Sequence, residues 1–139
     1  YTAPFGTTFG LVYEFDSGPP VNRRIAAAAL GFTHDPVVLG TLLRGLSDPD
    51  DELVQKSLLG IGVLGLPDTP LGEIRRRLEQ DPNHWTRINA AFALLCIAGA
   101  GNHSAELTES CRLGCADAEA GSSCSARAEY PCLCSSLCE

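Results

Sequence analysis

The chain has 139 residues, of which 45% are hydrophobic and 6% aromatic, and it carries a formal net charge of −7. This length suits one domain with a single core, and the negative charge argues against a protein that binds duplex DNA or RNA, because that affinity depends mainly on Lys and Arg neutralising phosphates. The longest apolar run, at 90–101, is shorter than the roughly 20 residues that span a bilayer, so we expect a soluble protein.

Residues 1–20 differ in pattern from the rest of the chain. The stretch TFGLVYEF at 8–15 is rich in β-branched and aromatic residues and ends before Gly-Pro-Pro, which predicts a short strand or extended segment. Because no second strand is available for pairing, we expect an extended N-terminal cap that covers the helices after it. The alternative is that residues 1–20 are the remnant of a preceding repeat.

Residues 21–117 are predicted to form about two and a half copies of a helical repeat. The segments 21–52 and 53–84 each contain a helix, an Asp/Pro turn, a second helix and another Asp-Pro turn, and a third copy opens with WTRINAAFALLCIAGAGN. In our alignment, Val-x-Arg at 21–23 matches Val-x-Lys at 54–56 and Trp-x-Arg at 85–87. One helix pair cannot bury its own apolar faces, so the copies must stack.

Two kinds of helix are expected within each copy. AAAALGF and LLGIGVLG are apolar almost throughout, which predicts burial on more than one side and places Leu30 and Leu64 in the core. Gly60 and Gly62 each cost roughly 1 kcal/mol relative to Ala in a helix, which indicates that close packing compensates. PVVLGTLLRGL and PLGEIRRRLE are amphipathic, and an Asp before Pro can cap their first turns.

The order DPDDELVQKSLLGI at 48–61, followed by DTPLGEIRRRL at 68–78, resembles short bacterial HEAT repeats, including the subgroup found in phycobilin lyases. The resemblance covers residues 21 to about 102. It implies an all-α fold, a right-handed α-solenoid of antiparallel helix pairs, whose concave surface is lined by the second helix of each repeat. A repeat motif of this kind indicates fold and says little about activity.

We interpret the chain as a protein–protein interaction scaffold without catalytic activity, which binds another protein of unknown identity. The alternative, which rests only on the resemblance, is a phycobilin lyase-like or chaperone subunit for chromophore attachment. The candidate contact surface consists of the polar residues near the starts of the concave helices: Asn22, Arg23, Gln55, Lys56, Arg87 and Asn89. Their alternative role is pairing with the Asp-rich turns of adjacent repeats, at Asp48, Asp50, Asp51 and Asp81.

No constellation typical of an enzyme is found, and no cofactor is expected. The sequence contains no G-x-S-x-G, no H-E-x-x-H and no Gly-rich phosphate loop after a strand. His34, His84 and His103 occur singly in predicted turns, which favours solvated side chains. Cys96 is interpreted as a small buried apolar residue, and the basic clusters at 23–24 and 75–77 as solvated helix faces.

Six of the seven cysteines lie at or after position 111. Ser104 is a suitable N-cap for a third-repeat helix that would place Cys111 and Cys115 one turn apart. The Cys-rich tail at 118–139 lacks a helical pattern, and we expect it to be disordered or non-native. One alternative is that the tail cysteines form disulfides in an oxidising compartment. If they do not, a cytoplasmic location is favoured. The other is a zinc site formed by Cys111, Cys115, Cys134 and Cys138.

Overall fold

The computed structural model describes residues 5–102 and 104–105, and this part of the chain is all-helical, with no β-strand. The all-α prediction is therefore confirmed for these residues. The elements are α1 (Phe5–Ser17), α2 (Pro20–Gly31), the 3-10 helix η1 (Pro36–Val38), α3 (Leu39–Gly45), α4 (Asp51–Leu64), α5 (Gly72–Gln80) and α6 (His84–Gly99).

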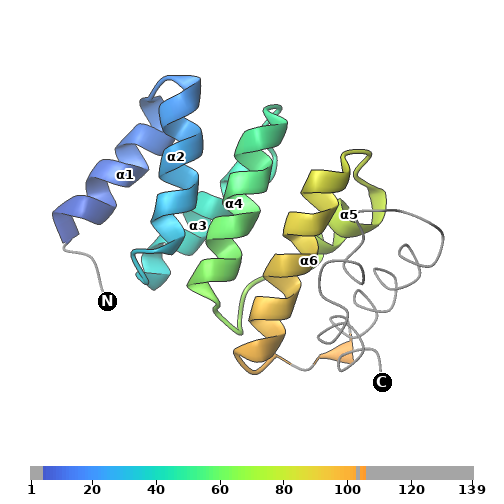
Figure 1. The fold of residues 1–139 in the computed structure, drawn as a ribbon. Helices are drawn as coiled ribbons and strands as arrows, with labels where there is room; N and C mark the ends of the chain where they lie inside the picture. The colour runs from blue at the N-terminus through green and yellow to red at the C-terminus, as the bar shows by residue number, and fades with distance from the viewer. Residues whose placement is uncertain (1–4, 103, 106–139) are drawn as a thin grey trace.

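The three longest helices after α1 form a row. Figure 1 shows α2, α4 and α6 side by side, with α3 and α5 in a second layer behind them and α1 next to α2 at one end. Each second-layer helix packs against the helix that follows it in the chain, α3 against α4 and α5 against α6. This arrangement leaves one side of the row without a covering helix among the described residues.

Residues 8–15 correct one of our predictions: they are not extended but form the middle of α1. Thr8 and Phe15 are buried and Leu11 and Val12 are partly buried, so the inward-facing positions follow the spacing of a helix. This packing outweighs the β-propensity of the local sequence, which depends strongly on context. The Gly-Pro-Pro stretch ends α1 and starts α2, with a proline in its first turn.

The register between the row helices also differs from the predicted alignment. The first residues of α2, α4 and α6 are Pro20, Asp51 and His84, so the step from α2 to α4 is two residues shorter than the step from α4 to α6. With this register the buried residues coincide at two successive levels. They are Ala27, Leu58 and Ala91 at one level and Leu30, Ile61 and Leu94 at the next. The counterpart of Arg23 is therefore Val54 and not Lys56.

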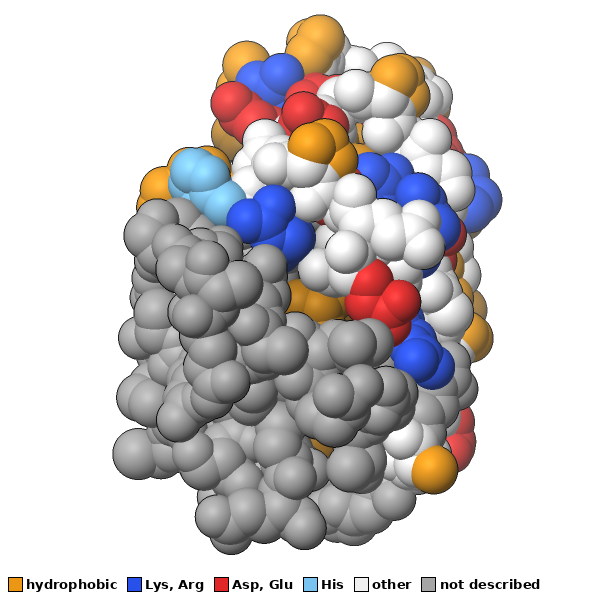
Figure 2. All heavy atoms as spheres, turned by 90° about the vertical axis from the view of Figure 1, so that its right-hand side faces the viewer, with side chains coloured by type: hydrophobic (Ala, Val, Ile, Leu, Met, Phe, Trp, Pro, Cys, Tyr) orange, Lys and Arg blue, Asp and Glu red, His pale blue; other side chains and the backbone are white. Residues whose placement is uncertain are grey.

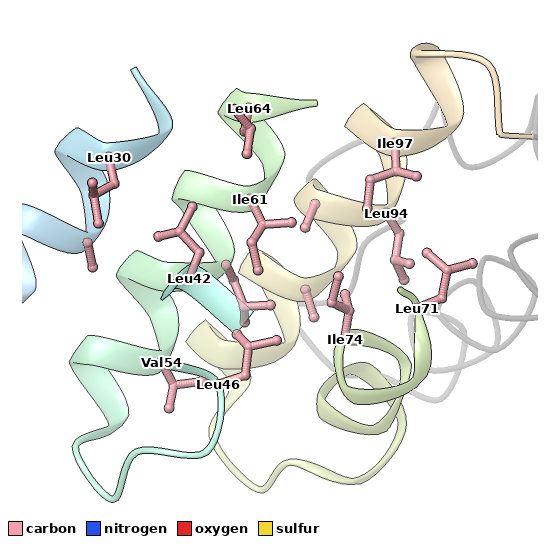
Figure 3. Packing of buried hydrophobic residues seen from close by; sticks show 14 of the residues in the cluster. Leu30, Leu42, Leu46, Val54, Ile61, Leu64, Leu71, Ile74, Leu94 and Ile97 are labelled. Carbon is pink, nitrogen blue, oxygen red and sulfur yellow. The ribbon is translucent and has the colours of Figure 1, made fainter. Parts of the chain in front are cut away.

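Small residues allow the row helices to approach closely, as predicted. A Cβ atom at Gly60 would lie 2.6 Å from the carbonyl oxygen of Ala27, and one at Gly62 would lie 2.5 Å from the ring of Phe92. Leu30 is fully buried and Leu64 is 8% exposed, which confirms both as core residues. Figure 3 shows the core formed by such side chains from α2, α4 and α6 together with residues of α3 and α5.

Candidate functional site

The turns before α4 and α6 share one hydrogen-bonding pattern. The Asp48 carboxylate accepts from the Asp50 amide at 2.9 Å, and the Asp50 carboxylate accepts from the Glu52 amide at 3.0 Å. Asp81 and Asn83 repeat these two contacts before α6, both at 2.9 Å. Each turn therefore satisfies amide groups that the first turn of the helix leaves free, and it sets where the row helix begins.

The basic cluster at 23–24 is bound to the acidic turn before α4. Arg23 contacts the Asp48 carboxylate at 2.9 Å and donates to the carbonyl oxygen of Phe15 at 2.8 Å. Arg24 contacts Asp50 at 2.8 Å and Glu52 at 3.2 Å. The hydrogen bond from Arg24 holds the pKa of the Asp50 carboxyl below its usual value.

The cluster at 75–77 on α5 is likewise engaged with carboxylates. Arg75 pairs with Glu79 at 2.6 Å, and Arg76 pairs with Glu73. Arg77 is largely buried, contacts Asp81 at 2.7 Å and also donates to the backbone carbonyl of the C-cap residue of α3. The prediction of a solvated side chain is therefore wrong for Arg77. Figure 2 shows Lys and Arg interspersed with Asp and Glu on this side of the molecule.

Five of the six predicted contact residues donate hydrogen bonds within the chain. Arg23 takes the alternative role that the sequence suggested, and Arg87 donates to the backbone carbonyl of Asp81 at 2.9 Å. Asn22 donates to Glu14, Gln55 to Thr86 and Asn89 to the carbonyl of Trp85. The exception is the exposed Lys56, for which no hydrogen bond or ion pair is found with the described residues.

A groove lies between α2 and α4 on the described part of the chain. It has a volume of about 570 Å³, and we call it the α2–α4 groove. Apolar side chains of α2 form most of its wall, and Val21, Ile25 and Phe32 among them are 60%, 63% and 58% exposed. The residues that line it are Val21, Arg24, Ile25, Ala28, Ala29, Phe32, Glu52 and Lys56.

A smaller pocket lies on the other side of Ile25. It has a volume of about 260 Å³ and is lined by Leu11, Glu14, Asn22, Ile25 and Ala26, between α1 and α2. Ile25 is thus shared by two hollows, and the outer stripe of α2 is accessible from both sides. Of the predicted contact residues, Lys56 lines the groove and Asn22 lines the smaller pocket.

Sequence reasoning missed the apolar wall of this groove. We predicted that the apolar stretch at 26–32 is buried on more than one side, whereas Phe32 is exposed, and so is Ile25 immediately before the stretch. A signal was present in the order of side chains. The large residues at 21, 25 and 32 lie on one stripe along α2 and its C-cap, whereas Leu30 and the alanines at 26 and 27 lie on the buried side, where a neighbouring helix must come close.

The remaining candidates for chemistry do not assemble into a site among residues 5–102 and 104–105. His34 is exposed, and His84 is the first residue of α6, where its ring lies 4.8 Å from that of Trp85. Cys96 is only half-buried, and burial raises the pKa of its thiol. In these ranges no three His, Cys, Asp or Glu side chains are grouped as metal ligands. The predicted zinc ligands, the proposed disulfides, His103 and the helix after Ala105 lie outside the described residues.

None of the described helices combines the length and apolar character needed to cross a bilayer. Comparison of the chain with protein-family models, curated proteins and solved structures gave no match.

Proposed function

We propose that this chain is a short right-handed α-solenoid of the HEAT type that binds another protein and has no catalytic activity of its own. The observation that carries the proposal is the α2–α4 groove, in which Val21, Ile25 and Phe32 are each more than half exposed. Exposed large apolar side chains that lie together on a rigid element are typical of docking surfaces, because their burial by a partner is favourable.

The solenoid assignment is supported by the regularity of the row. The buried residues of α2, α4 and α6 are in register, and the turns before α4 and α6 use the same Asp-Pro pattern to start a row helix. On this assignment the helix pairs are α1–α2, α3–α4 and α5–α6, so the row contains the second helix of each pair and forms the concave side of the solenoid. The contact surface is then centred on Ile25 and Lys56, and Arg23 has a structural role.

The binding assignment can be tested by placing a photo-crosslinking amino acid at position 25. Val37 on η1 provides a matched control, because it is also a large apolar residue, is 72% exposed and lies outside the groove. We expect irradiation in an extract of the source cells to link one defined protein to position 25 and not to position 37. That protein, once purified, should lose affinity for Ile25→Asp and keep it for Val37→Asp.

Equal affinity of the purified partner for both variants would contradict the proposed surface. The same would follow if positions 25 and 37 captured the same set of proteins. Circular dichroism of Ile25→Asp separates loss of binding from loss of fold. Because Ile25 is mostly exposed, we expect its replacement to leave the helical spectrum unchanged.

A second candidate function is a lyase-like or chaperone role in bilin attachment. It is supported by the size and lining of the α2–α4 groove, because about 570 Å³ of mainly apolar space beside a lysine suits a flat apolar molecule that bears carboxylates. Incubation of the chain with bilin and its apoprotein, followed by absorbance spectroscopy, tests this role. The absence of both chromophore binding and chromophore transfer would exclude it.

A further inference from the structure

Lys56 differs from every other basic residue that the structure describes. The seven arginines in this part of the chain all donate to a carboxylate or to a backbone carbonyl, as Arg44 does to Asp16 at 3.1 Å. Lys56 is the single lysine of the chain, and its exposed ammonium group has no such acceptor among the described residues. A lysine ammonium group that is not paired with a carboxylate therefore lies on the α4 side of the groove.

The other two charged residues that line the groove, Arg24 and Glu52, form an ion pair. Arg24 lies between the Asp50 and Glu52 carboxylates, at 2.8 Å and 3.2 Å. This pairing leaves Lys56 as the charge that an incoming group meets beside the apolar wall. A ligand complementary to the groove therefore carries an apolar stripe with a carboxylate next to it.

The groove offers an extended peptide no backbone groups to pair with, whereas a helix can bind it through side chains alone. Both of its walls are α-helices, whose inner amides and carbonyls already bond to each other, so no free edge is available to pair with a strand. A helix satisfies its own backbone groups before it binds. The exposed stripe of α2 from Val21 to Phe32 is roughly 17 Å long at 1.5 Å per residue, which matches three turns of a partner helix.

We infer that the α2–α4 groove binds an amphipathic α-helix of a partner protein, and that a carboxylate beside the apolar stripe of that helix pairs with Lys56. This inference rests on the proposed function and specifies its partner. The apolar stripe contributes most of the affinity, as in other complexes of a helix with a groove, and Lys56 selects for acidic helices and sets their register.

The experiment uses the full chain and three fluorescein-labelled peptides of equal length. The first peptide is stapled as a helix, with leucines at i, i+4, i+7 and i+11 and glutamates flanking the stripe. The second has lysines in place of the glutamates, and the third has the composition of the first but contains two prolines in place of the staple. Fluorescence anisotropy at low salt measures their affinities.

We expect saturable binding of the acidic helix and no binding of the proline peptide. The affinity of the basic helix should be lower than that of the acidic helix by a factor of about five or more. Lys56→Glu should reverse the preference between the two helices. Arg76→Glu makes the same change in net charge on α5, outside the groove, and should leave the preference unchanged. Ile25→Asp should weaken binding of both helices.

Several results would overturn the inference. Binding of the proline peptide at equal affinity would contradict recognition of a helix, and the same preference in the wild type and Lys56→Glu would contradict the role of the lysine. Failure of both helices to bind would remove the helix assignment altogether. The crosslinking comparison between positions 25 and 37 decides the proposed function separately, because it requires no assumption about the shape or charge of the partner.

Discussion

Asp50 has two functions in the turn before α4. Its carboxylate caps the helix by accepting from the Glu52 amide at 3.0 Å, and it pairs with Arg24 on α2 at 2.8 Å. At the equivalent place before α6, Asn83 performs only the first function, with its side-chain oxygen 2.9 Å from the Trp85 amide. The turns before α4 and α6 therefore differ in whether the capping side chain also forms an ion pair.

Replacement of Asp50 should separate these functions. Asp50→Ala removes the cap and the ion pair, and we expect a loss of about 1 kcal/mol from the cap alone. Asp50→Asn keeps the acceptor and should lose less. Because the folded-state pKa of Asp50 is lowered, its charge stabilises the fold above the unfolded pKa of about 3.9, and this contribution is lost as the pH falls through the folded value.

Urea unfolding at pH 7 and at pH 3 measures both effects. Asp50→Asn should be less stable than the wild type at pH 7, and the difference should shrink below about pH 3.9, because the unfolded wild-type chain then binds a proton at Asp50 that the folded state binds only at lower pH. Glu73, whose pKa is lowered by its hydrogen bond from Arg76, serves as background in both proteins. A difference that stays constant between the two pH values would contradict the role of the Asp50 charge.

The crossing of α2 and α4 depends on two glycines that face each other. A Cβ atom at Gly31 would lie 2.4 Å from the carbonyl oxygen of Gly60, and one at Gly60 would lie 2.6 Å from that of Ala27. Backbone atoms at these distances cannot move aside as a flexible side chain would. Any side chain at Gly60 must therefore push the two helices apart.

We expect Gly60→Ala to destabilise the fold although alanine is the better helix former. The gain in helix propensity is about 1 kcal/mol, whereas overpacking of a core typically costs about 1–3 kcal/mol and here involves two backbones. Gly40→Ala on α3 is the matched control, because no atom lies within 4 Å of its added Cβ. Thermal unfolding should show a lower Tm for Gly60→Ala and an unchanged or higher Tm for Gly40→Ala.

The opposite outcome has a clear meaning. If Gly60→Ala raised the Tm as much as Gly40→Ala does, the close approach of α2 and α4 would not be required for stability. The prediction that glycines in α4 serve packing would then fail.

The helices after residue 20 could be predicted because several local signals agree. The Asp-Pro turns, the apolar spacing and the glycines in α4 all point to the same elements, and the structure contains them at the expected places. Residues 8–15 could not be predicted in the same way. Their aromatic and β-branched side chains favour a strand locally, and only the surface of α2 decides that they form a helix.

The candidate site was predictable only in part, for a related reason. We selected Arg23 and Lys56 as equivalent residues because both are basic, but their places in the helices differ. Arg23 is bound to the turn before α4, and Lys56 faces the groove. The wall of the groove consists of apolar residues that resemble core residues in the sequence. Their exposure depends on which side of α2 its neighbours occupy, and this information is non-local.

A single continuous core joins all the helices of the described chain. It extends from Phe15 on α1 to Ala98 on α6, and each row helix contributes to it through contacts with its neighbours. In a long array of repeats, stability is roughly a sum over neighbouring pairs, and the ends can unfold separately. Each described helix packs on a neighbour through this core, so loss of one exposes core residues of the next.

We therefore expect a core substitution in α2 to lower the stability of α6 by the same amount as that of α2. Leu30→Ala on α2 should cost about 2–5 kcal/mol, because the side chain is fully buried, and Leu64→Ala on α4 should fall in the same range. Trp85 is the chain's single tryptophan and lies on α6, so its fluorescence reports the opposite end from Leu30. Far-ultraviolet circular dichroism reports all the helices together.

Both signals should follow one urea transition in the wild type, and Leu30→Ala should move both midpoints to the same lower concentration, since a two-state fold loses its parts together. Val37→Ala, at an exposed position on η1, should leave them unchanged. A Leu30→Ala variant whose helical signal falls before the Trp85 signal would mean that α1 and α2 unfold independently of α6. The α2–α4 groove would then open while the rest of the row stays folded, and partner binding would depend on the local stability of α2.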